Sequence, residues 1–394
     1  MAVRKAGKTD SLPGKIVKVA LICKHYLLSK GGLERYTISL SRELLKRGHE
    51  VHVFANRWQE ETGIVFHHVP MLRLSSPLKN ISFAYFTRKL LQEHRFDVIQ
   101  SMERILSQDI FRASDGINPI QMSERYSNRA VRQWKALGPR RQALSYLEKR
   151  IFERSGCRYV MTNSRLVKNQ ILDHYRISPD RICVIYNSVD HRRFNPSVRE
   201  KYRIEIRTEL GIPETDMLLL FAGNDFQRKG LALLVQSLNR LQNPRLKLMV
   251  VGHDRAGSRQ KRIAKNQLGD RIIFLGSQSR IEKYYGAADL LILPTRYDAF
   301  ANVCLEAMAC GIPVITTRTN GAGEIIDNGI HGYVLDTWEP EELASKIARC
   351  ISDDQFISEM GKHAFGRADT FTGERYMSEL MDLYDRVRIQ KEMK

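Results

Sequence analysis

The feature that most constrains the fold is an alternation of short apolar runs with longer stretches in which apolar residues recur every three or four positions. The short runs are rich in β-branched residues and are typical of buried parallel strands, and the longer stretches are typical of amphipathic helices. Strands that alternate with helices form βαβ units and a doubly wound parallel sheet. The sequence therefore predicts an α/β fold, with strands at residues 16–23, 50–55, 96–101, 158–164, 181–189, 217–223, 246–252, 271–276, 289–294, 313–317 and 332–336.

The length of the chain favours two domains. It has 394 residues, and a single hydrophobic core rarely grows beyond about 250–300 residues. The segment 186–196 is polar, carries Asn, Ser, Asp and Pro, and follows a predicted strand. We therefore place the junction there, which gives a first doubly wound domain over residues 1–190 and a second one that starts at residue 191.

Several classes of protein are excluded by what the sequence lacks. The longest apolar runs are far shorter than the ~20 residues that span a bilayer, and the basic first residues are not followed by the apolar stretch of a signal peptide. The six cysteines include no CxxC pair, which argues against a disulfide framework or a zinc site and favours a reducing compartment. We expect a cytoplasmic protein without a bound metal.

The charge of the chain is distributed unevenly. Residues 1–190 carry 33 basic and 17 acidic residues, whereas residues 191–394 carry 30 and 27. Such an excess predicts an anionic partner for the first half, which could be nucleic acid, a membrane surface or an acidic substrate. Residues 121–160, with 10 basic and 3 acidic residues, also interleave aromatic and aliphatic side chains. This segment either lies on an anionic membrane or is an ordinary set of helices with a solvated basic face.

A glycine pair marks the first candidate binding site. Gly31 and Gly32 lie where the first predicted strand turns into its helix. They permit close approach of a phosphate or sugar to a helix N-terminus, and the alternative is a simple tight turn. The GxGxxG pattern of nicotinamide and flavin enzymes is absent, which disfavours those classes.

Two cations mark the second candidate site. The predicted strand 217–223 ends at Gly223, a helix is expected near residue 230, and Arg228 and Lys229 lie in the connection, which we predict to be a loop. Ligands of α/β sheets bind at the carboxyl ends of the strands, so these cations could neutralise a diphosphate. The alternative is a solvated basic turn.

Two carboxylates mark the third candidate site. Asp298 and Glu306 flank a helix that is expected to start at about Asn302. The free N–H groups of Asn302 and Val303 could hold a phosphate, and Glu306 could accept hydrogen bonds from ribose hydroxyls. The alternatives are an acidic residue favoured by the helix dipole for Asp298 and a solvated side chain for Glu306.

Together these three places resemble the retaining glycosyltransferases of family 4, which have the GT-B fold. The family motif E-x7-E corresponds to Asp298-x7-Glu306, its diphosphate-binding RKG to residues 228–230, and its N-terminal glycine loop to KGGLER at residues 30–35. The GGLER turn, the NDFQRKG loop and the basic segment resemble most nearly the bacterial lipopolysaccharide-core glucosyltransferases. The resemblance implies two Rossmann-like domains that face a central cleft, at residues 1–190 for the acceptor and 191–372 for the nucleotide sugar. It also implies that a last helix at residues 373–394 packs back towards the first domain.

The resemblance also implies the roles of individual residues. Arg228 and Lys229 would stabilise the departing diphosphate, Asp298 would hold the hydroxyls of the transferred sugar, and Glu306 would hold the ribose. The departures are an Asp at the first motif position, Asn224 where many members have Arg, and Asp115 in FRASDGIN where many members have a His near the sugar. The chain has no Asp-x-Asp sequence, which agrees with metal-independent transfer, in which protein cations and helix N-termini carry the charge.

The sequence therefore predicts a metal-independent, retaining hexosyltransferase that uses a UDP-sugar, with glucose expected, and needs no cofactor. Its acceptor would be the lipopolysaccharide core or a similar anionic glycolipid, at the inner face of the cytoplasmic membrane, where the protein would bind peripherally. One alternative is a family member that acts on a capsular, exopolysaccharide or soluble acceptor. A nucleic-acid-binding protein is disfavoured because no recognisable RNA- or DNA-binding motif is present.

Overall fold

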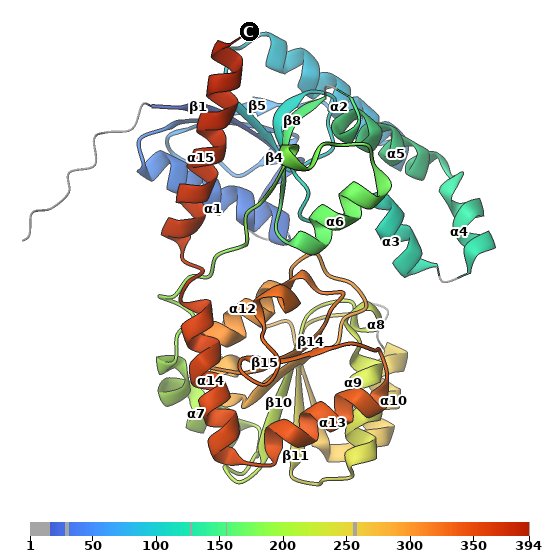
Figure 1. The fold of residues 1–394 in the computed structure, drawn as a ribbon, viewed down its shortest axis with the longest axis vertical. Coiled ribbons are helices and arrows are strands. Elements are labelled where there is room, and N and C mark those ends of the chain that lie inside the picture. Colours follow the sequence, from blue (N-terminus) through green and yellow to red (C-terminus); the bar gives the residue numbers. More distant parts are fainter. Residues whose placement is uncertain (1–15, 28–30, 127, 155, 255–257, 394) are drawn as a thin grey trace, which may run out of the picture. The chain divides into compact units, whose positions relative to one another are not determined.

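The structure, a computed structural model, describes residues 16–27, 31–126, 128–154, 156–254 and 258–393 (Figure 1). Within these residues the chain divides into two compact units. Unit 1 comprises residues up to 112, residues 137–160 and residues from 384 onwards, and unit 2 comprises residues 113–136 and 161–383. The domain bounds expected from the sequence, at residues 190 and 372, stay a prediction.

The first sheet has seven strands in the order β5-β3-β1-β6-β7-β8-β9. The pairs β3-β5, β1-β3, β1-β6 and β6-β7 are parallel. The strands are β1 Lys18–Ile22, β3 Glu50–Ala55, β5 Ile64–His68, β6 Val98–Ser101, β7 Gln108–Arg112, β8 Cys157–Thr162 and β9 Ile182–Val184, and a separate small sheet pairs β2 His25–Tyr26 with β4 Arg57–Trp58. All five strands predicted for the first half are confirmed.

Two strands of this sheet, β5 and β7, were not predicted from the sequence. Strand β5 lies at the edge of the sheet and is half exposed. Strand β7 is buried along its whole length although its sequence is QDIFR. Two of its polar side chains form hydrogen bonds: the Gln108 amide donates to the Gly156 carbonyl oxygen at 3.0 Å, and Asp109 accepts from the Ile99 N–H at 2.9 Å. Buried polar groups are tolerated when they are hydrogen-bonded in this way.

Helices connect the strands of the first sheet. Their bounds are α1 Gly32–Lys46, α2 Ser76–Gln92, α3 Asn118–Arg125, α4 Arg129–Ala136, α5 Pro139–Phe152, α6 Arg165–His174 and the short helix η1 Pro179–Arg181. Within unit 1, α2 packs against α5, and Phe83 on α2 and Leu147 on α5 lie in the same apolar cluster as Phe54 on β3. This cluster is part of the core of unit 1.

The second sheet lies in unit 2 and has six parallel strands in the order β12-β11-β10-β13-β14-β15. The strands are β10 Met217–Ala222, β11 Leu246–Val251, β12 Ile272–Gly276, β13 Leu290–Leu293, β14 Val314–Thr317 and β15 Gly332–Leu335, so all six predicted strands are confirmed. The order reverses between β10 and β13. Doubly wound sheets bind their ligands beyond the carboxyl ends of the strands at such a reversal.

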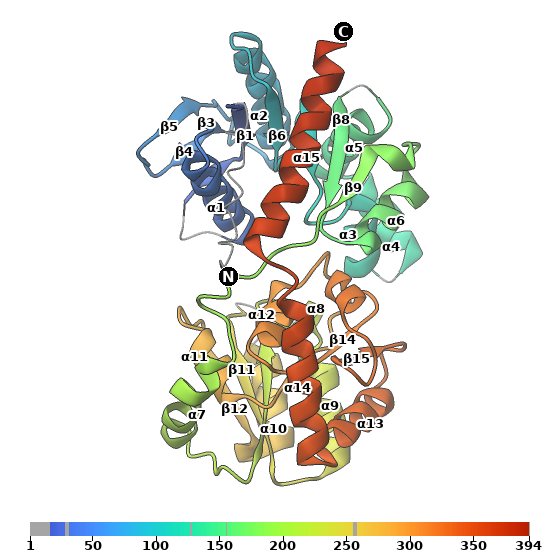
Figure 2. The ribbon, with the colours of Figure 1, turned by 60° about the vertical axis from the view of Figure 1, so that its left-hand side comes forward.

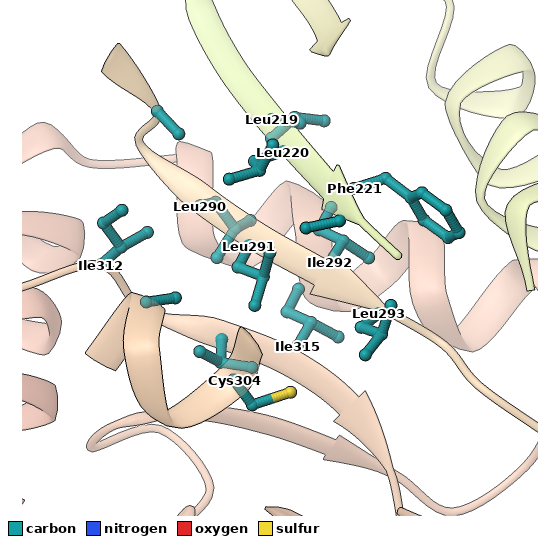
Figure 3. Packing of buried hydrophobic residues seen from close by; sticks show 14 of the residues in the cluster. Leu219, Leu220, Phe221, Leu290, Leu291, Ile292, Leu293, Cys304, Ile312 and Ile315 are labelled. Atoms are coloured by element: carbon teal, nitrogen blue, oxygen red, sulfur yellow. The ribbon is translucent and has the colours of Figure 1, made fainter. Parts of the chain in front are cut away.

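Helices cover both faces of the second sheet, with α12 and α14 towards one side and α9 and α10 towards the other (Figure 1). Their bounds are α7 Ser197–Glu209, α8 Phe226–Lys229, α9 Leu231–Leu241, α10 Ser258–Leu268, η2 Gly269–Arg271, α11 Glu282–Ala287, α12 Asn302–Ala309, η3 Gly321–Ile325, α13 Pro340–Ile351 and α14 Asp354–Ala368. Figure 3 shows the side chains of β10 and β13 packed with Ile315 of β14 and with Cys304 of α12. Cys304 is therefore a core residue.

A buried ion pair joins α7 to the start of β13. Arg207 is 1% exposed and pairs with Asp289, which also accepts from the Leu218 N–H at 2.9 Å and from Arg203 at 2.8 Å. Burial raises the pKa of Asp289, but the surrounding guanidinium groups, Arg207 first, outweigh it and lower the pKa below its ordinary value. The two sheets confirm the predicted α/β fold with doubly wound sheets.

The last helix, α15 Gly373–Glu392, belongs to both units, because its end from Tyr384 onwards is part of unit 1. Figure 2 shows this end beside the strands of the first sheet. Tyr384 is fully buried and bonds through its hydroxyl to the Gln100 side chain, and Lys391 donates to the Asp97 carbonyl oxygen at 3.1 Å. No helix in the described part of the chain is long and apolar enough to cross a membrane.

Candidate active site

The candidate site lies in unit 2, where the connection after β10 meets the connection after β13. Gly230 has a φ of +84°, and a Cβ there would overlap the carbonyl oxygen of Pro294, so only glycine allows the two segments to approach this closely. The Arg228 carbonyl oxygen accepts from the Arg296 N–H at 2.8 Å and from the Thr295 hydroxyl at 3.1 Å. These bonds hold the two connections side by side.

The predicted loop that carries Arg228 and Lys229 is in fact a short helix, so that prediction was wrong. Helix α8 covers residues 226–229. Asp225 precedes it with a φ of 61° and accepts from the Arg228 N–H at 3.3 Å. The side chain of an Asp can stabilise a left-handed residue and cap a helix at once, which explains why a helix begins directly after the strand. Gly223 follows β10, and a Cβ added there would lie 3.5 Å from the side-chain carbons of Lys229.

The structure brings Arg228, Lys229 and Asp298 together. Lys229, which is buried, forms an ion pair with Asp298, and Arg228 lies 3.4 Å from the same carboxylate oxygen. Arg228 also donates to the Tyr297 carbonyl oxygen at 2.8 Å. The side chain of Arg228 is 39% exposed and that of Asp298 is 18% exposed, so the cluster can meet a ligand from one side.

The cations decide the ionisation of Asp298. Burial raises the pKa of its carboxyl group, but the charge of Lys229 and then that of Arg228 outweigh burial, and the pKa lies below its ordinary value. The Phe300 N–H, which donates to Asp298 at 3.2 Å, acts in the same direction. Asp298 is therefore an anion at neutral pH and a fixed hydrogen-bond acceptor.

Asp115 is exposed and lies near this cluster, because its charge helps to raise the pKa of Tyr297. The next residue, Gly116, has a φ of +73°, and a Cβ there would overlap the Tyr297 hydroxyl. Tyr297 is 6% exposed and donates to Gln170 at 3.0 Å. Burial first, and then Asp298 and Asp115, raise the pKa of Tyr297, so its hydroxyl is protonated at all physiological pH values. A catalytic role for Asp115 stays a prediction.

The start of α12 is set by Asn320. This buried residue accepts from the Ala301 N–H at 3.1 Å, directly before the helix. Helix α12 begins at Asn302, as predicted. For the N–H groups of Asn302 and Val303, the described residues provide no acceptor, as is usual in the first turn of a helix. These groups remain available to an anion.

Glu306 is neither exposed nor simply solvated. It is partly buried on α12 and accepts at 2.9 Å from the hydroxyl of Tyr285 on α11, which also lies 3.3 Å from the Val303 carbonyl oxygen. Burial first, and then Glu306, raise the pKa of Tyr285 well above its ordinary value. Tyr285 thus fixes the carboxylate of Glu306 as a hydrogen-bond acceptor. Contact of Glu306 with a ribose stays a prediction.

Gly31 and Gly32 lie in unit 1 at the start of α1, as expected, and both are exposed. A Cβ at Gly32 would meet nothing within 4 Å, so the local backbone does not require glycine. Lys30, the first residue of the predicted glycine loop, lies outside the described residues. A ligand contact of this pair stays a prediction.

Three residues of the cluster were not found from the sequence: Tyr285, Tyr297 and Asn320. Tyr285 and Tyr297 read as ordinary core residues, since each is mostly buried. Asn320 lies in the TNGAGEII segment, which resembles the donor-site core of the family, but the residue itself was not singled out. The part of the chain that the structure describes contains no group of three His, Cys, Asp or Glu residues that could hold a metal ion.

The basic segment at residues 121–160 is only partly a surface feature. Leu147, Ile151 and Phe152 of α5, which belong to the apolar residues of this segment, are fully buried and cannot contact a membrane surface. Helix α4 differs, because it has no buried residue and its Trp134 is 66% exposed. The basic and apolar surface that remains is therefore centred on α4.

Two sequence families match this chain in consecutive segments. The family described as Glycosyltransferase Family 4 matches residues 30–193, and Glycosyl transferases group 1 matches residues 203–367. The chain belongs to these GT-B glycosyltransferases and is itself a glycosyltransferase.

Similar proteins agree with this class. The lipopolysaccharide glucosyltransferase WaaG of Escherichia coli K12 is 25% identical over 365 residues, covering 89% of this chain and 94% of the relative. A D-inositol 3-phosphate glycosyltransferase of Jonesia denitrificans is 22% identical over 413 residues, covering 94% and 96%.

Solved structures share the fold. A crystal structure of WaaG, a glycosyltransferase involved in lipopolysaccharide biosynthesis, has a TM-score of 0.77 at 23% identity, covering 93% of this chain and 98% of that chain. Anabaena Alr3699/HepE in complex with UDP and glucose has a TM-score of 0.69 at 19% identity, covering 94% and 99%.

Proposed function

We propose that this glycosyltransferase moves a hexose, with glucose expected, from a UDP-sugar to the lipopolysaccharide core or a similar anionic glycolipid. The observation that carries the proposal is the cluster of Arg228, Lys229 and Asp298 at the reversal of strand order in unit 2. Its cations suit a diphosphate, and its fixed carboxylate suits sugar hydroxyls. The relative WaaG acts as a lipopolysaccharide glucosyltransferase, and a neighbour in fold binds UDP and glucose.

In the proposed reaction the protein cations act on the leaving group. The bond between the anomeric carbon and the diphosphate oxygen breaks while charge grows on that oxygen. Arg228, Lys229 and the N–H groups of Asn302 and Val303 stabilise this charge, which needs no metal ion. The acceptor hydroxyl attacks from the same face, forms the new bond to the anomeric carbon, and passes its proton to a diphosphate oxygen. The anomeric configuration is therefore retained.

Asp298 and Glu306 position the donor. The ionised Asp298 accepts from hydroxyls of the transferred sugar, and Glu306, oriented by the Tyr285 hydroxyl at 2.9 Å, accepts from the ribose. In this proposal Asp115 lies near the transferred sugar, and Gly31 and Gly32 contact the nucleotide sugar. The protein uses no cofactor.

The test is a panel of UDP-glucose, UDP-galactose, ADP-glucose and GDP-mannose, with slow hydrolysis of each donor as the readout. Wild type should hydrolyse a UDP-hexose fastest, and EDTA should leave the rate unchanged. Arg228→Gln should lower the rate by roughly 10²–10³, whereas Arg192→Gln, which removes an exposed arginine outside the cluster, should not. Equal rates in the two variants would remove Arg228 from the site.

The acceptor needs a separate comparison. A lipopolysaccharide core that lacks its outer sugars and soluble inositol 3-phosphate should each be offered with the best donor. The second acceptor is included because a relative at 22% identity is a D-inositol 3-phosphate glycosyltransferase. Transfer to the lipopolysaccharide core, with the product's anomeric configuration retained by NMR, is the expected result. Transfer to the soluble acceptor alone would overturn the glycolipid proposal.

We also propose that the protein binds anionic membranes peripherally through α4, at the inner face of the cytoplasmic membrane. The helix exposes Trp134 beside Arg132 and Lys135, and the ammonium group of Lys135 lies 4.5 Å from the indole ring centre. Basic residues near an anionic surface contribute about 1 kcal/mol each, and this attraction is screened by salt. Co-sedimentation with anionic vesicles should fall with salt and with Trp134→Ala. Binding that is equal for neutral and anionic vesicles would contradict the proposal.

A further inference from the structure

A cavity in unit 2 is lined by arginines. Its volume is about 600 Å³, and its lining includes Arg165, Arg318, Arg367 and Arg375. Pockets of 300–1,000 Å³ are typical of small-molecule sites. None of the residues of the candidate active site, such as Arg228, Asp298 or Glu306, lines this cavity.

The arginines of this cavity are mostly without counter-charges. Within the described residues, the guanidinium groups of Arg165 and Arg318 have no hydrogen-bond or ion-pair partner. The Nε atom of Arg367 is buried and also lacks a hydrogen-bond acceptor. A buried donor that is left unsatisfied costs free energy, and so do like charges around one cavity. Arg375 differs, since it pairs with Glu379 at 2.8 Å.

The single carboxylate of the lining is already engaged. Glu324 accepts from the N–H groups of Arg165 and Leu166 at 2.8 and 2.6 Å and from the Tyr186 hydroxyl at 2.8 Å. It therefore caps the start of α6 and does not pair with the arginine side chains. The lining keeps an excess of positive charge that only an anion from outside can neutralise.

The remaining lining suits an organic ligand. Phe371 forms one part of the wall, with the guanidinium groups of Arg367 and Arg375 at 5.6 and 4.7 Å from its ring centre. Tyr186 and Ile325 add further aromatic and apolar surface. Planar guanidinium groups bind phosphate oxygens in a bidentate manner. The cavity thus combines phosphate-binding cations with an apolar wall.

We propose that this cavity is a second ligand site, separate from the donor site, which binds a small phosphorylated molecule through Arg165, Arg318 and Arg367. The inference does not depend on the proposed sugar transfer, because the two sites share no lining residue. The segment that carries Arg318 and Glu324 also bonds to the backbone of Asp298, through the Thr319 carbonyl oxygen at 3.1 Å and the Gly321 N–H at 2.9 Å. A ligand in the cavity therefore contacts the chain segment that positions Asp298.

The experiment measures the binding of inorganic pyrophosphate by titration calorimetry, with the protein first saturated with UDP. The variants are Arg165→Gln, Arg318→Gln and Arg367→Gln, and the matched control is Arg192→Gln, whose side chain is 95% exposed. Loss of one charge-assisted contact should weaken pyrophosphate binding about ten- to a hundredfold. The control should change it less than twofold. Arg165 and Arg318 are exposed, so their variants should unfold at the wild-type temperature.

A second arm distinguishes a free phosphate ester from a lipid headgroup. The same proteins are sedimented with phosphatidylcholine vesicles that contain phosphatidic acid. Pyrophosphate binding that depends on the cavity arginines supports a soluble ligand, and vesicle binding alone with that dependence supports a lipid phosphate. If the cavity variants bind both probes as Arg192→Gln does, the proposal is overturned. If UDP does not bind wild type, the proposed function fails, while the cavity result is read independently.

Discussion

Replacing Lys229 with Met tests whether the ion pair with Asp298 governs the site. Methionine has a similar length and keeps the apolar contacts of the lysine stem. It removes the ammonium group from a carboxylate that is 18% exposed. The substitution therefore leaves a mostly buried anion with one weaker cationic neighbour.

The magnitude follows from the contacts that remain. Removing one partner of a buried ion pair costs about 3–5 kcal/mol. Here Arg228 stays 3.4 Å from the carboxylate and the Phe300 N–H stays at 3.2 Å. Because these contacts offset part of the loss, we expect Lys229→Met to lower the free energy of unfolding by about 2–3 kcal/mol at neutral pH.

The pH dependence has a defined sign. In wild type the folded pKa of Asp298 is lowered, so its stabilisation is present above the unfolded pKa of about 3.9 and is lost as the pH falls through the folded pKa. Without Lys229, burial dominates and raises the folded pKa, so the variant loses stability as the pH rises above about 4. The difference between the two proteins should therefore be larger at pH 8 than at pH 5.

Urea unfolding at pH 5 and pH 8, followed by circular dichroism, measures this difference. Asp298→Asn added to Lys229→Met should restore most of the lost stability at pH 8, since it removes the unpaired charge. Lys265→Met, in which the lost ion pair with Asp270 is exposed, is the matched control and should show little change. A Lys229→Met defect that is equal at both pH values and unaffected by Asp298→Asn would refute the reasoning.

Three further substitutions test other parts of unit 2. Glu306→Gln should weaken UDP binding by about 1.5–3 kcal/mol, measured by calorimetry, because a charge-assisted acceptor oriented by Tyr285 is lost. Asp289→Asn should destabilise the protein by about 3 kcal/mol at pH 7, because Arg207 stays buried without its partner. Its lowered folded pKa means that the difference from wild type should shrink as the pH falls below about 4. Gly230→Ala should lower the melting temperature by several degrees and abolish donor hydrolysis, because the backbone needs a positive φ in a space without room for a Cβ.

Each of these three predictions has an outcome that would contradict it. Unchanged UDP affinity in Glu306→Gln would show that this residue has a structural role only. Wild-type stability of Asp289→Asn at pH 7 would mean that the buried arginine finds other acceptors. Gly366, for which a Cβ would meet nothing within 4 Å, gives the matched control Gly366→Ala for Gly230→Ala. Similar losses in both variants would contradict the argument from close approach.

Most strands of both sheets could be predicted because buried parallel strands are continuous apolar runs. Strand β7 was not predicted because its buried residues include Gln108 and Asp109, whose hydrogen bonds to distant segments replace apolar contacts. Sequence spacing cannot show bonds of this kind. The chain path through α8 was also missed, since a left-handed Asp225 followed by a short helix is a local exception to the usual turn preferences.

The residues that carry charge in the candidate site could be predicted from their positions at strand ends, and the structure brings Arg228, Lys229 and Asp298 together. The groups that orient them could not. Tyr285 and Asn320 act through bonds that join segments 16–21 residues apart, and the sequence does not show which residues such bonds join. The arginines around Glu324 were missed for the same reason, because they come from four separate elements or loops.

The position of α15 has a consequence for how the protein folds during its synthesis. Tyr384 is buried against Gln100, from which it is separated by 284 residues along the chain. Nascent chains fold domain by domain as they leave the ribosome. Unit 1 therefore has to wait, with an uncovered patch around β6, while all of unit 2 is translated. A nascent chain that stops before residue 384 leaves this patch exposed to chaperones. The packing around β6 therefore forms only after this part of α15 has been synthesised.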